Sequence, residues 1–163
     1  MSDEIRIREA RREDVPLLLE FIRELAEYEK LADEVVATEA ALERTLFGER
    51  RYAEALIAEA GDAPAGFALF FHNYSTFLGK PGIYLEDVFV RPEFRGRGIG
   101  RGFFRRLGEL ALERGCGRLE FWVLDWNRPA IDFYRKLGAE PMSDWTVQRI
   151  TGEALNRLAA DDT

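Results

Sequence analysis

The sequence has 163 residues, of which 47% are hydrophobic and 33% charged, a balance typical of one soluble globular domain over residues 1–163. Its net charge of −7 argues against nucleic-acid binding, which depends on a basic surface. No apolar run approaches the roughly 20 residues of a membrane-spanning helix, so no membrane association is expected. The acidic N-terminus lacks the pattern of a secretory signal, and Cys116 is the only cysteine. We therefore expect a cytoplasmic protein without an internal disulfide.

The first half of the chain predicts a strand, two helices and three further strands. Residues 5–8 alternate with period two, and the apolar residues over 15–26 follow helical spacing. Thr38 is placed to cap a second helix. The next strands are expected at residues 52–59, 65–74 and 83–90. A turn at residues 61–64 makes the first two of them an antiparallel hairpin, whereas residues 75–82 predict a longer, exposed connection.

The second half of the chain alternates between helices and strands. A helix with one apolar face is expected from Ile99 to Ala111, followed by a strand over residues 119–123. Pro129 opens a short helix that Gly138 ends, and a last strand is expected near residues 145–150. This order predicts the α/β (α+β) class, with a mixed sheet covered by helices on its faces.

Two adjacent carboxylates interrupt the apolar strand over residues 84–90. Neighbouring side chains of a regular strand face opposite sides, so Glu86 and Asp87 are not expected to reach the same partner. Two interpretations remain open. The strand is either an exposed edge strand, or a central strand that borders a wet cleft.

A glycine-rich segment, Arg-Gly-Arg-Gly-Ile-Gly-Arg over residues 95–101, leads directly into the amphipathic helix. Glycines let the backbone approach a ligand closely, and the unpaired N–H groups of a helix N-terminus favour phosphate. The three arginines add charge that suits a diphosphate. The spacing is neither that of a P-loop nor a good dinucleotide fingerprint. A solvent-exposed loop with arginines is the alternative.

These features together resemble the GNAT superfamily of N-acetyltransferases. Its coenzyme-A signature matches Arg95-x-x-Gly98-x-Gly100, and Asn127 and the pair Phe133-Tyr134 fall at the spacing of that fold. Within the superfamily the chain is most similar to the diamine (spermidine/spermine) acetyltransferases. The stretches that match them are residues 24–29, 84–87, 95–100, and 126–129 followed by 133–134. The resemblance implies a mixed sheet of about six to seven strands with helices on both faces.

The resemblance also implies roles for individual residues. Acetyl-CoA would be the co-substrate, with a strand bulge exposing the Val88 N–H to the acetyl carbonyl as an oxyanion donor. Glu86 is the candidate general base, acting through water, and Tyr134 the candidate general acid toward the coenzyme-A sulfur. The acceptor contacts are expected at Tyr28, Glu29, Glu86 and Glu120. The coenzyme contacts are expected at Val88, Phe89, Val90, Arg95, Gly96, Arg97, Gly98, Ile99, Gly100, Arg101, Asn127, Pro129, Ala130 and Tyr134.

The expected reaction is direct acetyl transfer, in a ternary complex, to a small cationic amine such as a polyamine, a diamine or a thialysine-like or lysine-like molecule. A homodimer is implied, with residues 144–150 as a contact segment. The chain departs from the polyamine enzymes at residues 73–82 and 142–145, which leaves the amine open. The alternatives are a non-catalytic acyl-CoA-binding module, a nucleotide phosphate-binding protein, and an acetyltransferase of protein lysines or N-termini.

Three side chains, Tyr134, His72 and Cys116, have structural expectations beside the functional ones. Tyr134 has the alternative of packing beside Phe133. His72 is expected to be a partly buried histidine whose hydrogen bonds are satisfied. Cys116 is expected to pack rather than act as a nucleophile, which would need a histidine base nearby. One histidine and one cysteine far apart in the sequence make a metal site unexpected.

Overall fold

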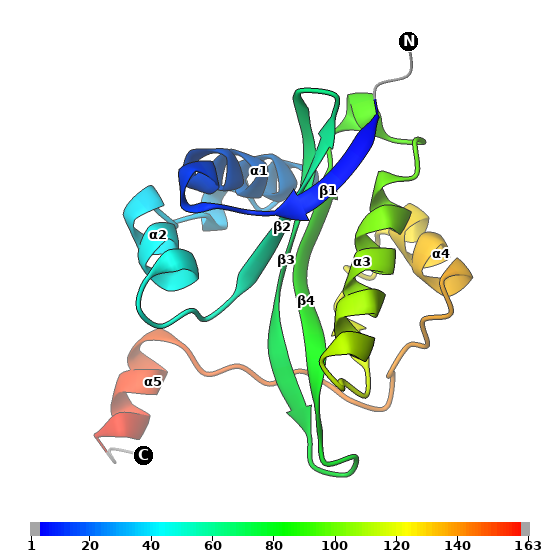
Figure 1. Ribbon diagram of the computed structural model, residues 1–163. Coiled ribbons are helices and arrows are strands. Elements are labelled where there is room, and N and C mark those ends of the chain that lie inside the picture. Colours follow the sequence, from blue (N-terminus) through cyan, green and yellow to red (C-terminus); the bar gives the residue numbers. More distant parts are fainter. Residues whose placement is uncertain (1–3, 161–163) are drawn as a thin grey trace. The chain divides into compact units, whose positions relative to one another are not determined.

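The computed structural model describes residues 4–160 (Figure 1). It divides into two compact units, of which the first ends at Trp122 and the second begins at Val123. Each unit is described by itself. None of the helices within residues 4–160 has the length and apolar character needed to cross a membrane.

The first unit contains one five-stranded sheet in the order β1-β2-β3-β4-β5. Its strands are β1 (Ile5–Glu9), β2 (Glu54–Ala60), β3 (Ala63–Ser75), β4 (Lys80–Val90) and β5 (Leu119–Phe121). The first four strands pair antiparallel with their neighbours, and β5 joins β4 in parallel. The hairpin of β2 and β3 is confirmed, and the sheet is mixed as expected.

Helices cover both faces of this sheet, as Figure 1 shows for α1 (Val15–Tyr28), α2 (Glu39–Phe47) and α3 (Ile99–Glu113). On one face, Phe21 of α1 stacks on Phe67 of β3, with ring centroids 5.5 Å apart, inside the main hydrophobic core. On the other face, Phe104 of α3 meets Phe121 of β5 edge to face, at 5.3 Å. Burial of these apolar faces is the dominant stabilising contribution.

Local signals in the sequence set the helix ends. The Thr38 hydroxyl oxygen accepts a hydrogen bond from the Ala41 N–H at 3.1 Å and caps α2 as predicted, a contact worth about 1 kcal/mol. Gly98 takes the left-handed conformation, with φ of 81°, immediately before α3 begins at Ile99. This conformation is open to glycine and strained for other residues.

The second unit contains two helices among its described residues, α4 (Arg128–Lys136) and α5 (Gly152–Ala159). The Asn127 side-chain oxygen accepts a hydrogen bond from the Ala130 N–H at 3.3 Å and so caps α4. Gly138 has a φ of 96° and lies where the predicted end of the helix was expected. Helix α5 was not predicted, although Leu155 and Leu158 lie at helical spacing.

Three expectations about the strands are wrong. The sheet has five strands among the described residues, not six to seven. Residues 145–150 were expected to form a last strand, but they form no ladder in the described chain, and a strand needs a partner for its backbone groups. The connection between β3 and β4 is also shorter than residues 75–82. Pro81 and Gly82 belong to β4, where they oppose Tyr74 and Asn73.

Candidate functional site

The strand that carries the two adjacent carboxylates is central, since β4 lies between β3 and β5. The interpretation as an edge strand is therefore wrong. The register pairs Leu69 with Asp87 but Phe70 with Leu85, which leaves Glu86 unmatched. Glu86 is thus the extra residue of a β-bulge. The expected bulge in this strand is present.

The bulge changes which side chains of β4 face each side of the sheet. Before it, Leu85 is paired with Phe70, which lines a small pocket together with Leu110 of α3. After it, Asp87 is paired with Leu69, which packs against the core beneath α1. One extra residue reverses the alternation, so Leu85 faces α3 and Asp87 faces the side of α1. The regular alternation of β4 is therefore interrupted between Leu85 and Asp87.

The Asp87 carboxyl lies in an environment that disfavours its charged form. Burial, and after it the negative charges of Glu86 and Glu29, raise the pKa of Asp87 from its ordinary 3.8 to about 7. Burial also raises the pKa of Glu29, which follows the last residue of α1. Three carboxylates from two elements therefore influence one another. A carboxyl with a pKa near neutrality can both accept and return a proton at physiological pH.

The edge of β4 beyond the bulge is open. Strand β5 pairs with β4 only from Ile83 to Leu85, so no strand of the described chain follows this edge farther. The Arg91 N–H donates to the Ala65 oxygen at 2.8 Å, which fixes the direction of the backbone groups. Alternation along an antiparallel pair then points the N–H and C=O of Val88 and Val90 away from β3. These groups can receive an extended ligand as an added strand would be received, although the Val90 oxygen already accepts one hydrogen bond, from the Arg95 Nε.

The glycine-rich segment follows this edge directly. Gly96 and Gly98 have φ of 80° and 81°, and a Cβ built on either residue would meet nothing within 4 Å. The space at the start of α3 is therefore open on the side that the glycines expose. The first N–H groups of a helix have no partner within the helix. Ile99, Gly100 and Arg101 supply these donors, in a geometry that fits a phosphate.

The three arginines of the segment have different surroundings. The Arg95 guanidinium turns back toward α1 and lies over the Tyr28 ring, 5.1 Å from its centroid, and over the Phe89 ring at 5.8 Å. Its Nε donates a hydrogen bond to the Val90 oxygen at 2.9 Å. Arg97 lies over the Phe94 ring at 5.4 Å, and Arg101 is exposed on the first turn of α3.

The Glu120 carboxylate is held by two neighbours on the same face of the sheet. The Asn73 Nδ2 and the Arg118 Nε each lie 2.9 Å from its Oε1. Glu120 is paired across strands with Tyr84, three positions before Asp87. Phe121 contacts α3, so Glu120 faces the other way, toward the side of α1, as Asp87 does. The structure thus brings Glu120 and Asp87 to one face.

The remaining predicted residues belong to the second unit. Asn127 is 6% exposed, and its side chain caps α4, whose first turn contains Pro129 and Ala130. Tyr134 and Phe133 lie next to each other on α4, with ring centroids 5.7 Å apart. The alternative of ring packing beside Phe133 is therefore present in the structure, while the phenol itself is the group available for proton transfer.

Comparison with known proteins identifies the family. The profile described as "Acetyltransferase (GNAT) family" matches residues 18–139, which includes the bulge, the glycine-rich segment and the helix of Tyr134. The chain belongs to the GNAT acetyltransferase family. The resemblance found in the sequence is thereby confirmed.

Named relatives of this GNAT protein acetylate amines. It is 43% identical to the thialysine N-epsilon-acetyltransferase of Bos taurus, over 95% of this chain and 97% of the relative. It is 32% identical to an L-ornithine N5-acetyltransferase of Arabidopsis thaliana, over 94% of this chain and 87% of the relative. An integron cassette protein of V. cholerae has a TM-score of 0.80 and 27% identity, with 98% of each chain covered. The protein is an N-acetyltransferase.

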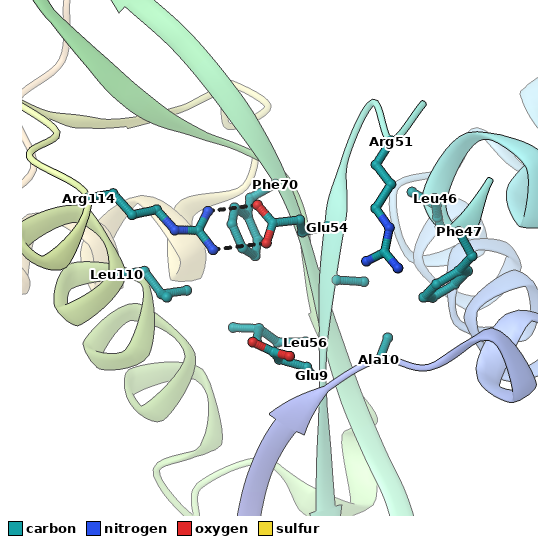
Figure 2. Close-up of a pocket in the computed structure, with 11 residues that line it drawn as sticks. Glu9, Ala10, Leu46, Phe47, Arg51, Glu54, Leu56, Phe70, Leu110 and Arg114 are labelled. Carbon is teal, nitrogen blue, oxygen red and sulfur yellow. Dashed lines mark hydrogen bonds and ion pairs between the residues drawn. The ribbon is translucent and has the colours of Figure 1, made fainter. Parts of the chain in front are cut away.

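One pocket in the structure of the acetyltransferase lies elsewhere, past the end of β1 (Figure 2). Its volume of about 40 Å³ suits one or two water molecules rather than a coenzyme. Figure 2 shows the bidentate ion pair between Arg114 and Glu54 on its wall, with distances of 2.7 and 2.9 Å. This pair also lowers the pKa of Glu54. The residues that line the pocket include none of the predicted site residues.

His72 and Cys116 lie close together but do not form a nucleophile and its base. The His72 Nδ1 is 3.0 Å from the Gly82 carbonyl oxygen, which only accepts, so Nδ1 carries the proton. The Nε2 lies 3.0 Å from an Arg114 nitrogen, which only donates. No basic nitrogen remains for the Cys116 thiol, 3.9 Å from Nδ1. His72 is satisfied as expected, although it is exposed rather than partly buried.

Two parts of the site were missed by sequence reasoning. Sequence reasoning singled out Glu86 and not Asp87, whose pKa is raised to about 7; the adjacency of the two carboxylates in an apolar strand was the available signal. Arg118 was not singled out, because a lone arginine before a strand carries no pattern. Its position beside Glu120 depends on the pairing of β5 with β4.

Proposed function

We propose that this GNAT protein transfers the acetyl group of acetyl-CoA directly to the primary amine of a small cationic molecule, within a ternary complex. The observation that carries the proposal is the bulge at Glu86. It places the Asp87 carboxyl directly before the open backbone edge of Val88 and Val90, which leads into the glycine-rich segment. Acceptor chemistry and donor binding thus meet on one short stretch of chain.

The donor side would be formed by backbone groups more than by side chains. The open edge of Val88–Val90, with Phe89 holding the strand in the core, would receive the pantetheine arm as an added strand. The N–H groups at the start of α3 would bind the diphosphate, with Arg97 and Arg101 adding positive charge. We expect Asn127, Pro129 and Ala130 of the second unit to contribute further contacts to the coenzyme.

The acceptor side would be formed by Glu29, Glu86 and Asp87. Their negative charge favours an approaching ammonium group, which must lose a proton before it can attack. With a pKa of about 7, the Asp87 carboxylate is a better acceptor for that proton than a carboxylate of ordinary pKa. We therefore propose Asp87 as the proton acceptor, with Glu86 placed beside it to act through water. Tyr28 would form the end of the acceptor site on α1.

The reaction would have two steps, the attack of the amine on the thioester and the expulsion of the coenzyme-A thiolate. The amine nitrogen forms a bond to the thioester carbonyl carbon, and its proton passes to the carboxylate. The carbonyl oxygen becomes an oxyanion, which the Val88 N–H stabilises. Collapse breaks the carbon–sulfur bond, and the Tyr134 hydroxyl gives a proton to the departing thiolate. The products are the N-acetyl amine and coenzyme A.

Direct transfer is supported by the surroundings of the only cysteine in the sequence. An acetyl-enzyme route needs a nucleophile with an adjacent base. The only cysteine, Cys116, lies beside His72, whose ring nitrogens are both engaged. His72 is paired with Ile83, which precedes the bulge, rather than with Asp87.

Thiol release from acetyl-CoA tests the proposal with the full-length protein and a panel of amines that includes spermidine, putrescine, lysine, thialysine and a lysine peptide. We expect release that depends on a small amine, with initial-velocity lines that intersect when both substrates are varied. Parallel lines would contradict the ternary complex. Binding of coenzyme A without release for any amine would favour a regulatory module, and release with the peptide alone would favour a protein acetyltransferase.

We also propose that the protein forms a homodimer through residues 144–150. Trp145, Val147 and Ile150 are 78%, 54% and 55% exposed, and large apolar side chains gathered on an exposed segment are typical of an interaction surface. A strand from a second copy would supply the backbone partner that this segment lacks in the described chain. Light scattering after size exclusion should give twice the mass of 18.7 kDa. Replacement of Val147 by Lys should shift the mass to that of a monomer.

A further inference from the structure

The face of the sheet that carries Asp87 also carries an aromatic surface. The rings of Phe71 and Tyr84 have centroids 5.0 Å apart, and the Trp122 ring meets Tyr84 edge to face at 5.7 Å. Phe71 belongs to β3 and Tyr84 to β4, and Trp122 directly follows β5. Trp122 is 58% exposed, so part of this surface is open to solvent. The rings of such a surface can pack against the aliphatic stem of a ligand and attract its cationic groups.

A pair of opposite charges borders this surface. Arg118 directly precedes β5, two residues before Glu120, and the Arg118 Nε is 2.9 Å from the Glu120 Oε1. The second carboxylate oxygen has no hydrogen bond to another described residue, and the outer guanidinium nitrogens have only a 3.4 Å contact with the Tyr74 oxygen. The pair therefore presents an acceptor and a set of donors side by side.

The position of Glu120 is fixed at some energetic cost. The Asn73 amide nitrogen holds the carboxylate, but its Oδ1 is buried with no hydrogen-bond partner among the described residues. A buried unpaired carbonyl costs about 1–3 kcal/mol. The arrangement also requires glycine at position 82, since a Cβ there would lie 2.4 Å from this oxygen. A fixed arrangement with such an energetic cost is typical of functional sites.

The distance along the strand matches a particular length of ligand. Glu120 is opposite Tyr84, and Asp87 is three positions farther along β4. At about 3.3 Å per residue, with one residue taken up by the bulge, this separation is roughly 7–10 Å. An extended chain of five bonds spans roughly 6 Å, and hydrogen bonds at each end add to that length. A lysine-sized molecule thus reaches from one group to the other.

From these features we propose that Arg118, Glu120 and Trp122 form a specificity subsite for the free α-amino-acid end of the acceptor. The acceptor class is an α,ω-diamino acid, whose distant amine reaches Asp87. Arg118 would bind the α-carboxylate and Glu120 the α-ammonium, with the stem on Trp122. An oligoamine has no carboxylate, and the positive charge of Arg118 would repel it. This inference rests on the proposed amine acetylation.

The test compares lysine with two analogues that each lack one charged group of its head: lysine amide and 6-aminohexanoate. With acetyl-CoA saturating, kcat/KM for lysine should exceed that for each analogue by about tenfold or more, as expected for charged hydrogen bonds. Arg118→Gln should abolish the preference over lysine amide only, and Glu120→Gln the preference over 6-aminohexanoate only. Arg105→Gln, an exposed ion-pair arginine on α3, is the matched control and should keep both preferences.

A binding measurement complements the kinetics. In the presence of coenzyme A, which has no acetyl group to transfer, lysine should change the tryptophan emission, and Trp122→Phe should remove most of that change. Thermal unfolding checks that each variant folds.

The proposal is overturned if the wild-type protein shows equal kcat/KM for lysine and lysine amide, or prefers spermidine to lysine, or if Arg118→Gln leaves the preferences intact. In each of these cases acetylation itself still stands. No thiol release with any amine would instead contradict the proposed function, and the subsite with it.

Discussion

The Arg95 guanidinium carbon lies 5.1 Å from the centroid of the Tyr28 ring, while the Arg95 Nε donates a hydrogen bond to the Val90 oxygen. One side chain therefore joins the end of α1, the end of β4 and the glycine-rich segment. Tyr28 immediately precedes Glu29, one of the three interacting carboxylates. Arg95 is placed to align the proposed acceptor site with the donor segment.

Arg95→Lys keeps the positive charge but loses the planar stacking and the Nε donor. We expect kcat/KM for the amine to fall about tenfold, while the dissociation constant of coenzyme A changes less than about twofold. Arg97→Lys is the matched control, and there the larger effect should be on coenzyme-A affinity. Calorimetry with coenzyme A and steady-state kinetics separate the two. Equal losses of coenzyme-A affinity in both variants would make Arg95 a diphosphate ligand instead.

Gly98→Ala tests the helix start. Gly98 has a φ of 81°, so an alanine there is strained even though its Cβ would have open space. We expect the KM for acetyl-CoA to rise about tenfold or more, because the loop must move to relieve the strain. Gly108→Ala in the same helix is the control. It has ordinary helical backbone and open space, and should stabilise the protein by about 1 kcal/mol without changing that KM.

Asp87→Asn should separate stability from activity. The pKa of Asp87 is about 7 in the folded protein and ordinarily 3.8, so the folded state holds a proton that the unfolded state releases. The contribution of Asp87 to stability is therefore lost as the pH rises from about 4 to 7. Asparagine does not titrate, so the variant does not lose this stability as the pH rises. Relative to wild type, the variant should gain about 1–3 kcal/mol by pH 7.5, with a smaller gain at pH 5.

The same variant should lose most of its acetylation activity at pH 8, while wild-type kcat/KM rises with pH through about 7. Asp62→Asn, in the exposed turn between β2 and β3, should alter neither property. Calorimetric unfolding at several pH values and initial rates provide both readouts. A variant with unchanged stability at every pH would show that Asp87 is solvated in the folded protein.

The sequence predicted the parts of the fold that local pattern determines. The apolar spacing of α1 and α3, the cap at Thr38 and the hairpin of β2 and β3 all follow from neighbouring residues. The glycine-rich segment was equally visible, because a left-handed residue before a helix restricts the choice to glycine. Local signals of this kind are sufficient to indicate the family from the amino-acid sequence alone.

The parts that depend on partners distant in sequence were not predictable. A bulge in β4 was expected from the family resemblance, but its position at Glu86 depends on the register between β3 and β4, and this position decides that Asp87 faces α1. The surroundings of the Arg118–Glu120 pair depend on the pairing of β5 with β4. Residues 145–150 show the converse case. Their local composition predicts a strand, but local composition alone does not supply a neighbouring strand.

Tyr134→Phe tests the acid proposed for the departing thiolate. The substitution removes only the hydroxyl and keeps the ring that lies 5.7 Å from Phe133, so the helix α4 should remain folded. We expect kcat to fall by roughly 10²-fold with the affinity for coenzyme A nearly unchanged, because the proton is needed only as the carbon–sulfur bond breaks. Tyr74→Phe, at a tyrosine that is 60% exposed, is the control and should retain full activity.

The identity of the thiol distinguishes proton donation from a packing role for Tyr134. An acyl donor whose thiol is more acidic than coenzyme A leaves without help from an acid, so it should restore much of the rate of Tyr134→Phe. A variant that has lost only packing would gain no such advantage over the wild-type protein. An unchanged kcat with acetyl-CoA would remove Tyr134 from the mechanism, and water would then have to protonate the thiolate.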